Sequence, residues 1–345
     1  MKKNLLTACS ALLLLYLLPL VLPGGTAARA EEASAPLPTI RTLVFSPGSS
    51  QEGEPLEEPP APTPSPSPLP ERRLRLQAGD EILDLSLEEY LVGVVAAEMP
   101  ASFPEEALKA QAVAARSYAL CQISSGKHPE ADLCADPGCC QAWLDEDQLR
   151  ENWGGSYEEN LARIRDAVAA TAGETLSYEG EPVLAVFHSS SAGATEDCGA
   201  IWSPRPYLVS VSSPETPRDV PGYVSELRCA PLDFRDVILS AYPKADFSGP
   251  EEAWIGPEKR DGSGRVESLE LGGVSIPGKE LRSLFSLRST AFTLAYEEGT
   301  FVFTVTGFGH GVGMSQYGAM VMARDGAGYR EILSHYYPGT ELVCG

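Results

Sequence analysis

The sequence predicts an α+β fold in which helices and antiparallel or mixed sheets surround a substrate cleft. Segments with helical periodicity mix with short strand-like segments, but they lack the regular strand–helix–strand order of a parallel α/β sheet. No internal repeat is visible in the 345 residues. A membrane segment and a disordered linker are expected before the folded part. The chain therefore divides into residues 1–30, 31–71 and a folded domain over 72–345.

The N-terminal segment predicts export. Lys2 and Lys3 precede an apolar run from Leu5 to Leu22, which is near the minimum length for spanning a bilayer. The two lysines stay inside and place the remainder on the extracytoplasmic face of the membrane. Ala28-Arg29-Ala30 also fits a cleavage site, so a single-pass anchor and a secreted protein are alternatives.

The segment from residue 31 to 71 is rich in proline, serine and glutamate, above all over 57–68. Such a composition cannot build a core and predicts a semi-extended, solvated spacer. A docking peptide rich in proline is the alternative. The chain also carries 48 acidic against 26 basic residues, a net charge of −22. That balance argues against nucleic acid and against an anionic membrane surface, and leaves a sugar polymer open.

The folded domain opens with a predicted strand over 73–85 and a helix. Ser86 and Glu89 fit a capping box, and Pro100 ends the helix after Ala97. A second, alanine-rich helix starts near Pro104 and is expected to be central. Further along, we expect a loop over 126–144, helices over 158–171, 233–241 and 325–335, and strands over 183–187, 266–271 and 300–305.

Glu98 ends an apolar helical segment just before the proline break. A carboxyl group against an apolar wall is held partly protonated, as a general acid requires. A solvated helix end is the alternative. Lys109 and Arg116 are seven residues apart on the next helix and therefore share a face, from which they would reach a glycan. Ordinary surface cations are the alternative for this pair.

Residues 307–318 contain five glycines and follow a predicted strand. Glycine lets a backbone turn tightly and approach another group closely. The segment lacks the Lys-Ser/Thr pair of a phosphate-binding loop. We therefore expect it to face a sugar through backbone groups and His310, with a helix opening at Gln316 and Tyr317.

Four ordered segments resemble the stage II sporulation protein D family, which shares its domain with amidase-enhancer proteins of bacterial walls. They are residues 87–100, 106–119, 188–196 and 309–319, and the resemblance spans about 72–344. One departure is Ala192-Gly193, where two glycines are expected.

This resemblance implies a peptidoglycan lytic transglycosylase that acts in engulfment during sporulation. It would cut between N-acetylmuramic acid and N-acetylglucosamine in peptide-stripped strands and leave 1,6-anhydro ends. Glu98 matches the catalytic position. The implied partners are glycan strands, a sporulation cell-wall amidase and membrane scaffold proteins. The expected substrate contacts are Lys109, Arg116, His188, Ser189, Ser190, His310, Ser315, Gln316 and Tyr317.

Two other functions compete with this one. A noncatalytic glycan-binding protein that stimulates a cell-wall amidase is the main alternative. A zinc-dependent amidase is weaker, because the sequence has no His-Glu-x-x-His pattern.

The loop over 126–144 also predicts a metal site. His128, Cys134 and Cys140 offer one imidazole and two thiolates, and similar family members carry zinc there. Three ligands would leave a fourth position open, as in functional zinc sites. A disulfide among Cys134, Cys139 and Cys140 is the alternative outside the cell. With zinc bound, Cys139 could stay free, and Cys198 and Cys229 could pair with each other because both lie outside the motifs.

Overall fold

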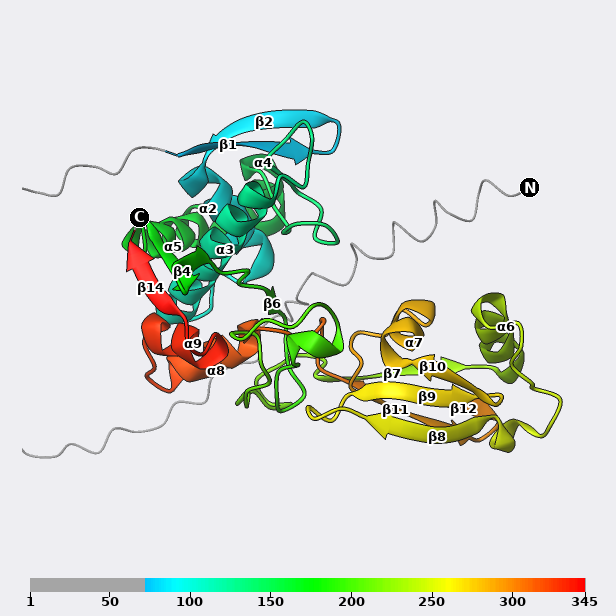
Figure 1. Cartoon of the computed structure of the whole chain (residues 1–345). Coiled ribbons are helices and arrows are strands. Elements are labelled where there is room, and N and C mark those ends of the chain that lie inside the picture. The colour runs from blue at the N-terminus through cyan, green and yellow to red at the C-terminus, as the bar shows by residue number, and fades with distance from the viewer. Residues whose placement is uncertain (1–71, 345) are drawn as a thin grey trace, which may run out of the picture. The chain divides into compact units, whose positions relative to one another are not determined.

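The computed structural model describes residues 72–344 (Figure 1). The expected membrane segment (1–30) and linker (31–71) lie outside the described residues. Within the described part, no helix is long and apolar enough to cross a membrane. Helices and small sheets are mixed in this part of the chain, as the α+β prediction requires. The described residues form four three-stranded sheets and one two-stranded sheet.

The domain begins with a hairpin. Strand β1 (Arg73–Ala78) pairs antiparallel with β2 (Glu81–Ser86), and the short β3 (Leu133–Cys134) adds to β1 in parallel. The single strand predicted over 73–85 is therefore wrong. Gly79 breaks it by adopting φ +61°, a left-handed conformation that a two-residue hairpin turn requires.

Helix α2 (Leu87–Glu98) begins and ends where the sequence predicts. The capping box forms, since the Glu89 N–H donates to Ser86 Oγ at 3.2 Å and the Ser86 N–H donates to Glu89 Oε2 at 2.7 Å. The helix stops because Met99, which precedes Pro100, is extended with φ −123°. Glu98 is consequently held at a defined helix end.

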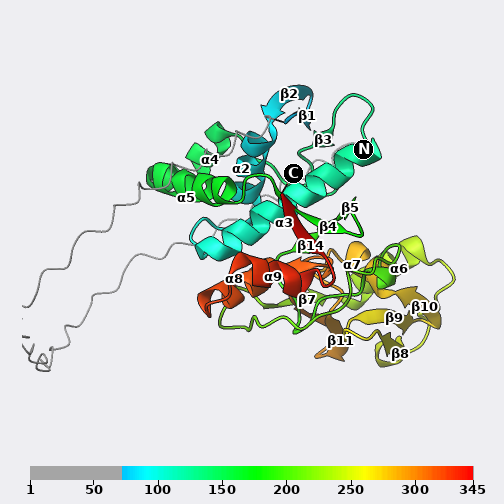
Figure 2. The same cartoon turned by 60° about the vertical axis from the view of Figure 1, so that its left-hand side comes forward.

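Helix α3 (Glu105–Ser125) is central, as predicted. It contacts α2, α5 (Tyr157–Ala170), α8 (Gln316–Arg324) and α9 (Tyr329–Tyr336), which lie around it in Figure 2. Small side chains permit this close approach on several sides. The fully buried alanines of α3 are Ala107, Ala110, Ala112, Ala114, Ala115 and Ala119.

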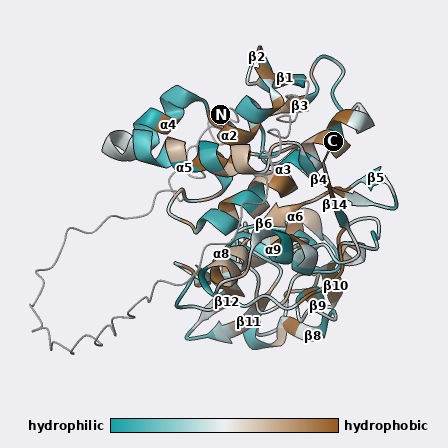
Figure 3. Ribbon diagram, turned by 90° about the vertical axis from the view of Figure 1, so that its left-hand side faces the viewer, coloured by the Kyte–Doolittle hydropathy of each residue, from teal (hydrophilic) through white to brown (hydrophobic). Residues whose placement is uncertain are grey.

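Helix α5 illustrates how the surrounding helices cover this core. Polar and apolar residues alternate along its ribbon in Figure 3, and the buried set includes Leu161, Ile164 and Val168. That spacing gives one apolar face, as in any amphipathic helix. The prediction of a helix over 158–171 is confirmed.

A second hydrophobic core is built by the elements drawn together at the right of Figure 1. Two three-stranded sheets and two helices surround it, and Phe234 stacks on Phe301 with ring centroids 4.0 Å apart. The predicted helix and two strands of this region are confirmed. The elements are β7 (Val224–Cys229), α6 (Pro231–Ala241), β8 (Ile255–Arg260), β9 (Val266–Leu271), β10 (Val274–Pro277), α7 (Gly278–Leu284), β11 (Phe292–Glu297) and β12 (Thr300–Thr306).

Two other predicted elements differ in the structure. Only Phe187–His188 (β6) of the expected strand over 183–187 is a strand, and it pairs in parallel with β13 (Met314–Ser315). The helix expected over 325–335 is present as α9 but starts only at Tyr329, because Gly326 adopts φ +103° in the turn after α8 ends at Arg324. The remaining elements are α4 (Glu146–Trp153), β4 (Glu174–Tyr178), β5 (Glu181–Pro182) and β14 (Glu341–Cys344).

Candidate active site

Glu98 is a half-buried carboxyl group at the end of α2. Its Oε1 accepts a hydrogen bond from the Ala142 N–H at 3.1 Å, and its Oε2 accepts one from Gln316 Nε2 at 3.3 Å. Burial raises the pKa of Glu98, and the two hydrogen bonds offset only part of that effect because they favour the charged form. The carboxyl group therefore keeps its proton to a higher pH than an ordinary glutamate does.

The segment that carries Ala142 is fixed against α2. Gly93 permits this contact, since a Cβ there would lie 2.2 Å from Trp143 Nε1. The Leu144 N–H donates to the Gly93 carbonyl at 3.3 Å. The Tyr90 hydroxyl donates to Gln141 Oε1 at 3.0 Å. Bonds on both sides of Ala142 thus aim its N–H at Glu98.

The glycine-rich segment brings the second partner of Glu98. Gly309 and Gly313 have φ of +114° and +71°, and a Cβ on Gly313 would lie 2.1 Å from the Val186 carbonyl oxygen. The close backbone approach expected for this segment is confirmed. Ser315 then caps α8, where its Oγ accepts from the Gly318 N–H at 3.1 Å. Gln316 follows as the first helical residue.

Two histidines lie side by side next to this segment, with ring centroids 5.8 Å apart. His188 is buried, and its two ring nitrogens lie 2.7 Å from Ser191 Oγ and 3.2 Å from the Val312 carbonyl oxygen. Burial holds the pKa of His188 well below its ordinary range. Burial also lowers the pKa of His310 to about 4, and its Nδ1 accepts from the Val312 N–H at 3.1 Å. Both rings are consequently neutral at neutral pH.

The expected substrate contacts near β6 and β13 are brought together. The Tyr317 N–H donates to the Ser189 carbonyl at 3.0 Å, and the Tyr317 ring meets Phe103 edge-on at 5.1 Å. Ser190 Oγ is buried and has no hydrogen-bond partner among residues 72–344. Ser315 is fully buried. Contact of these residues with a substrate stays a prediction.

Lys109 and Arg116 have different environments. Lys109 Nζ pairs with Glu105 at 2.6 Å and with Glu106 at 2.9 Å, and its side chain is 17% exposed. These two partners raise the pKa of Lys109. A glycan that binds Lys109 would therefore have to compete with these two carboxylates.

Arg116 is only 1% exposed, so the alternative that it is a surface cation is wrong. Its Nη2 pairs with Glu88 Oε2 at 2.8 Å, and its Nη1 donates to the Thr171 carbonyl at 2.9 Å. Arg116 thus joins α2 to the C-terminal end of α5, where free carbonyls accept from a cation. Because Arg116 is buried, it does not share a solvent-facing surface with Lys109. Contact of Arg116 with a glycan stays a prediction.

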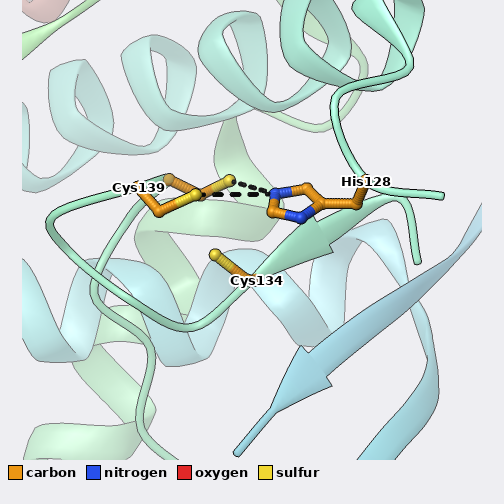
Figure 4. A group of neighbouring side chains, drawn as sticks. His128, Cys134 and Cys139 are labelled. Atoms are coloured by element: carbon orange, nitrogen blue, oxygen red, sulfur yellow. Dashed lines mark hydrogen bonds between the residues drawn. The ribbon is translucent and has the colours of Figure 1, made fainter. Parts of the chain in front are cut away.

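Four side chains that could hold a metal ion lie together in the loop before Ala142 (Figure 4). The ligand atoms of His128, Cys134, Cys139 and Cys140 all lie within 4.8 Å of one another. His128 Nε2 is 3.2 Å from Cys140 Sγ and 3.7 Å from Cys139 Sγ. A tetrahedral zinc with Zn–S bonds of about 2.3 Å separates its ligands by about 3.8 Å, so the donor set fits such an ion.

Cys139 lies beside the three predicted ligands. A turn at Asp136 places it there, because the Cys139 and Cys140 N–H groups donate to the Asp136 carbonyl at 3.0 and 2.8 Å. Three thiols and one imidazole form a complete four-ligand set. Such a set is typical of closed, structural sites, whereas the three predicted ligands alone would leave a fourth position open, and which of the two sets binds an ion stays a prediction.

The expected disulfides are absent from the described residues, where all cysteines are free. Cys198 belongs to the first hydrophobic core, and its Sγ lies 3.2 Å from the Ser203 carbonyl oxygen. Cys229 packs against the second core. The predicted Cys198–Cys229 pair is wrong because the two thiols face different cores.

Comparison with known proteins identifies the family. A family model described as Stage II sporulation protein matches residues 77–178. Stage II sporulation protein D of Bacillus amyloliquefaciens is 38% identical over 263 residues, covering 75% of this chain and 74% of that protein. The Bacillus subtilis protein of the same name is 35% identical over 342 residues, covering 98% and 94%. This chain belongs to the stage II sporulation protein D family.

The chain is also similar to a protein with a different name. The amidase enhancer of Bacillus subtilis is 29% identical over 304 residues, covering 73% of this chain and 40% of that protein. The residues matched by the family model, 77–178, contain Glu98 and the four side chains of the possible metal site. The glycine-rich segment lies outside that match.

One group at this site has no signal in the sequence. The Ala142 N–H is a backbone donor, and any residue type at this position would supply it. Only the packing of Trp143 on Gly93 brings it to Glu98. Side-chain patterns cannot reveal such a contact.

Proposed function

We propose that this family member is a peptidoglycan lytic transglycosylase with Glu98 as its acid and base. The supporting observation is the Glu98 carboxyl group, whose burial raises its pKa and whose oxygens are held by two amide donors. Family membership supports a role in sporulation, where such cleavage would act in engulfment. The proposed substrate is a glycan strand stripped of its peptides.

The proposed reaction uses one carboxyl group twice. Protonated Glu98 donates its proton to the glycosidic oxygen between N-acetylmuramic acid and N-acetylglucosamine as that bond breaks. The carboxylate then accepts the proton of the C6 hydroxyl while the C6 oxygen bonds to C1, which closes the 1,6-anhydro ring. Hydrolases that activate water need a second carboxylate. Both of these hydrogen-bond donors to Glu98 are amides, and neither is a second carboxylate.

Glu98→Gln tests this mechanism. The amide keeps the size of the side chain but has no transferable proton, so turnover of peptide-stripped strands should fall at least about a hundredfold. The thermal midpoint and glycan binding should be retained. Mass spectrometry should find anhydro-ended products from the wild type, without oxygen from labelled water. Reducing ends that carry the label, or full activity of Glu98→Gln, would contradict the proposal.

The alternative is a noncatalytic enhancer of a cell-wall amidase, and the printed name of one relative favours it. In that case the chain alone should release no product from stripped strands. It should instead accelerate a separate amidase on intact peptidoglycan, and Glu98→Gln should preserve that effect.

We also propose that the four-ligand cluster binds one zinc ion through His128, Cys134, Cys139 and Cys140. When bound, the ion would supply structural cross-linking of the loop. A loop held in this way would also hold the Ala142 N–H in place, because Ala142 follows Cys140 by two positions and donates to Glu98.

The last part of the proposal concerns location. Residues 1–30 would anchor or export the chain, residues 31–71 would space it from the membrane, and residues 72–345 would act on the extracytoplasmic face. The partners would be glycan strands, a sporulation amidase and membrane scaffold proteins. Protease added to intact protoplasts should digest the folded domain. Protection of that domain until the membrane is lysed would contradict this location.

A further inference from the structure

A second buried carboxyl group, Glu215, lies behind the glycine-rich segment and is 3% exposed. Its Oε1 accepts from the Ser191 N–H at 2.6 Å and from Ser315 Oγ at 2.5 Å. Its Oε2 accepts from Ser213 Oγ at 2.5 Å, which in turn lies 2.8 Å from the Tyr336 hydroxyl. We call Glu215, Ser191, Ser213, Ser315 and Tyr336 the Glu215 cluster.

The Glu215 cluster links three chain segments through hydrogen bonds to one carboxyl group. A buried carboxyl group is costly unless its oxygens are satisfied, and here both oxygens accept hydrogen bonds. The donors come from the segment after β6, from the loop before β7 and from the end of β13. A single side chain therefore joins three regions that are far apart in the sequence.

The first turn of α8 lies directly on this cluster. A Cβ on Gly318 would be 2.0 Å from the Tyr336 hydroxyl oxygen and 2.8 Å from Glu215 Oε2, so only glycine fits there. Ser315 is shared, because it donates to Glu215 and caps α8 by accepting from the Gly318 N–H. These contacts fix the position and the direction of the first turn of α8.

Gln316 follows the shared serine, and its side chain reaches Glu98. The Gln316 Nε2 to Glu98 Oε2 distance of 3.3 Å is near the upper limit of a hydrogen bond, so a displacement of roughly half an ångström would break it. The Tyr317 N–H adds a bond to the Ser189 carbonyl at 3.0 Å, which keeps the start of α8 against the segment after β6.

We infer that Glu215 is a positioning residue of this active site: by binding Ser191 and Ser315 it fixes the first turn of α8, so that Gln316 stays against Glu98. Glu215 acts through Gln316 and does not touch the reacting atoms. The effect on catalysis rests on the proposed transglycosylase function, whereas the effect on Gln316 does not.

Kinetics of the full chain on peptide-stripped strands tests the catalytic side. Glu215→Ala should lower kcat at least about tenfold, because Gln316 is then no longer held against Glu98. Glu215→Gln keeps an acceptor oxygen for Ser191 and Ser315 and should restore kcat to within about threefold of the wild type. Gln316→Ala should match Glu215→Ala, and the double variant should lose no more than either alone.

Ser213→Ala is the matched control. It removes the donor to Oε2 but leaves the bonds from Ser191 and Ser315 in place, so its kcat should fall clearly less than that of Glu215→Ala. Equal losses for these two variants, additive losses in the double variant, or failure of Glu215→Gln to restore activity would each overturn the inference.

A measurement independent of activity uses the side-chain amide of Gln316. The chain has only seven glutamines, so its NMR signal can be assigned by its loss in Gln316→Ala. Glu98→Ala and Glu215→Ala should each move this signal toward that of an exposed glutamine, and Glu215→Gln should not. If Glu215→Ala does not fold, Ser315→Ala breaks the same link and should move the signal in the same way.

The two proposals fail separately in this design. A chain without turnover whose Gln316 signal still responds to Glu215→Ala would refute the transglycosylase and leave the positioning role in place. An active chain whose Gln316 signal ignores both Glu215→Ala and Ser315→Ala would refute the positioning role alone.

Discussion

At the scale of single residues, two opposite effects set the pKa of Glu98: its burial and its hydrogen bonds from two amide donors. Burial raises the pKa, and the Ala142 N–H and Gln316 Nε2 lower it by binding the carboxylate. A general acid must start protonated, so kcat/KM should fall as the pH rises through the raised pKa of Glu98.

Gln316→Ala removes one donor to the carboxylate and should therefore raise the pKa of Glu98 further. The descending limb of the profile of kcat/KM against pH should move to higher pH than in the wild type. Initial rates on stripped strands over a pH series measure this, with the full chain and the same buffer ions throughout. A limb that moves to lower pH, or does not move, would show that Gln316 does not bind the carboxylate.

Glu98 itself could be predicted from sequence, since an apolar helix followed by Met99-Pro100 marks both its burial and its position at a helix end. Its partners could not. Gln316 lies 218 residues away, and Ala142 contributes only a backbone N–H. Arg116 shows the same limit, because a seven-residue spacing predicts a shared face but not that α5 covers it.

At the scale of elements, the sequence predicted those helix ends that depend on neighbouring residues. The capping box and the proline break of α2 involve residues three positions apart or adjacent, and both are confirmed. The strand expected over 183–187 failed because strand pairing depends on a partner, and only Phe187–His188 meets β13. Gly79 divided the strand predicted over 73–85, and Gly326 delayed the start of the helix predicted over 325–335, because both glycines adopt positive φ.

The loop between α3 and α4 gives a prediction at this scale. Protein purified under reducing conditions should hold one zinc, and Cys134→Ser, Cys139→Ser and Cys140→Ser should each weaken binding at least about tenfold, since even residues around metal ligands have effects of that size. Cys121→Ser is the control, because Cys121 is a free cysteine on α3 outside the cluster. Metal analysis after a chelator challenge measures occupancy. If Cys139→Ser is the only one of these variants that keeps full zinc, the ligands are the three predicted from the sequence: His128, Cys134 and Cys140.

At the scale of the whole described domain, two hydrophobic cores are joined by a buried ion pair. Glu196, whose N–H donates to the Gly311 carbonyl at 2.8 Å, lies beside the first core. Arg265 precedes β9 of the second core, and its Nε lies 3.5 Å from Glu196 Oε2. Ser263 Oγ also donates to Glu196 Oε2 at 2.9 Å. The sequence could not predict this link, because both residues lie in loops without a periodic pattern.

The pair should make the stability of the domain depend on pH. Burial, with Asp261 close by, raises the pKa of Glu196 from 4.5 to about 7. The folded state therefore binds this proton more tightly than the unfolded chain. The resulting stabilisation is fully present below pH 4.5 and is lost as the pH rises to about 7, which amounts to about 3 kcal/mol.

Glu196→Gln isolates that contribution, because the amide resembles the protonated acid and does not titrate. The free energy of unfolding of the wild type minus that of Glu196→Gln should be small near pH 4.5 and should become more negative by about 3 kcal/mol toward pH 8. Urea unfolding of both proteins at matched pH measures the difference. A difference that stays constant, or becomes more positive as the pH rises, would mean that Arg265 stabilises the Glu196 carboxylate by more than burial costs it. The two cores would then be held together by the charged pair rather than by the protonated acid.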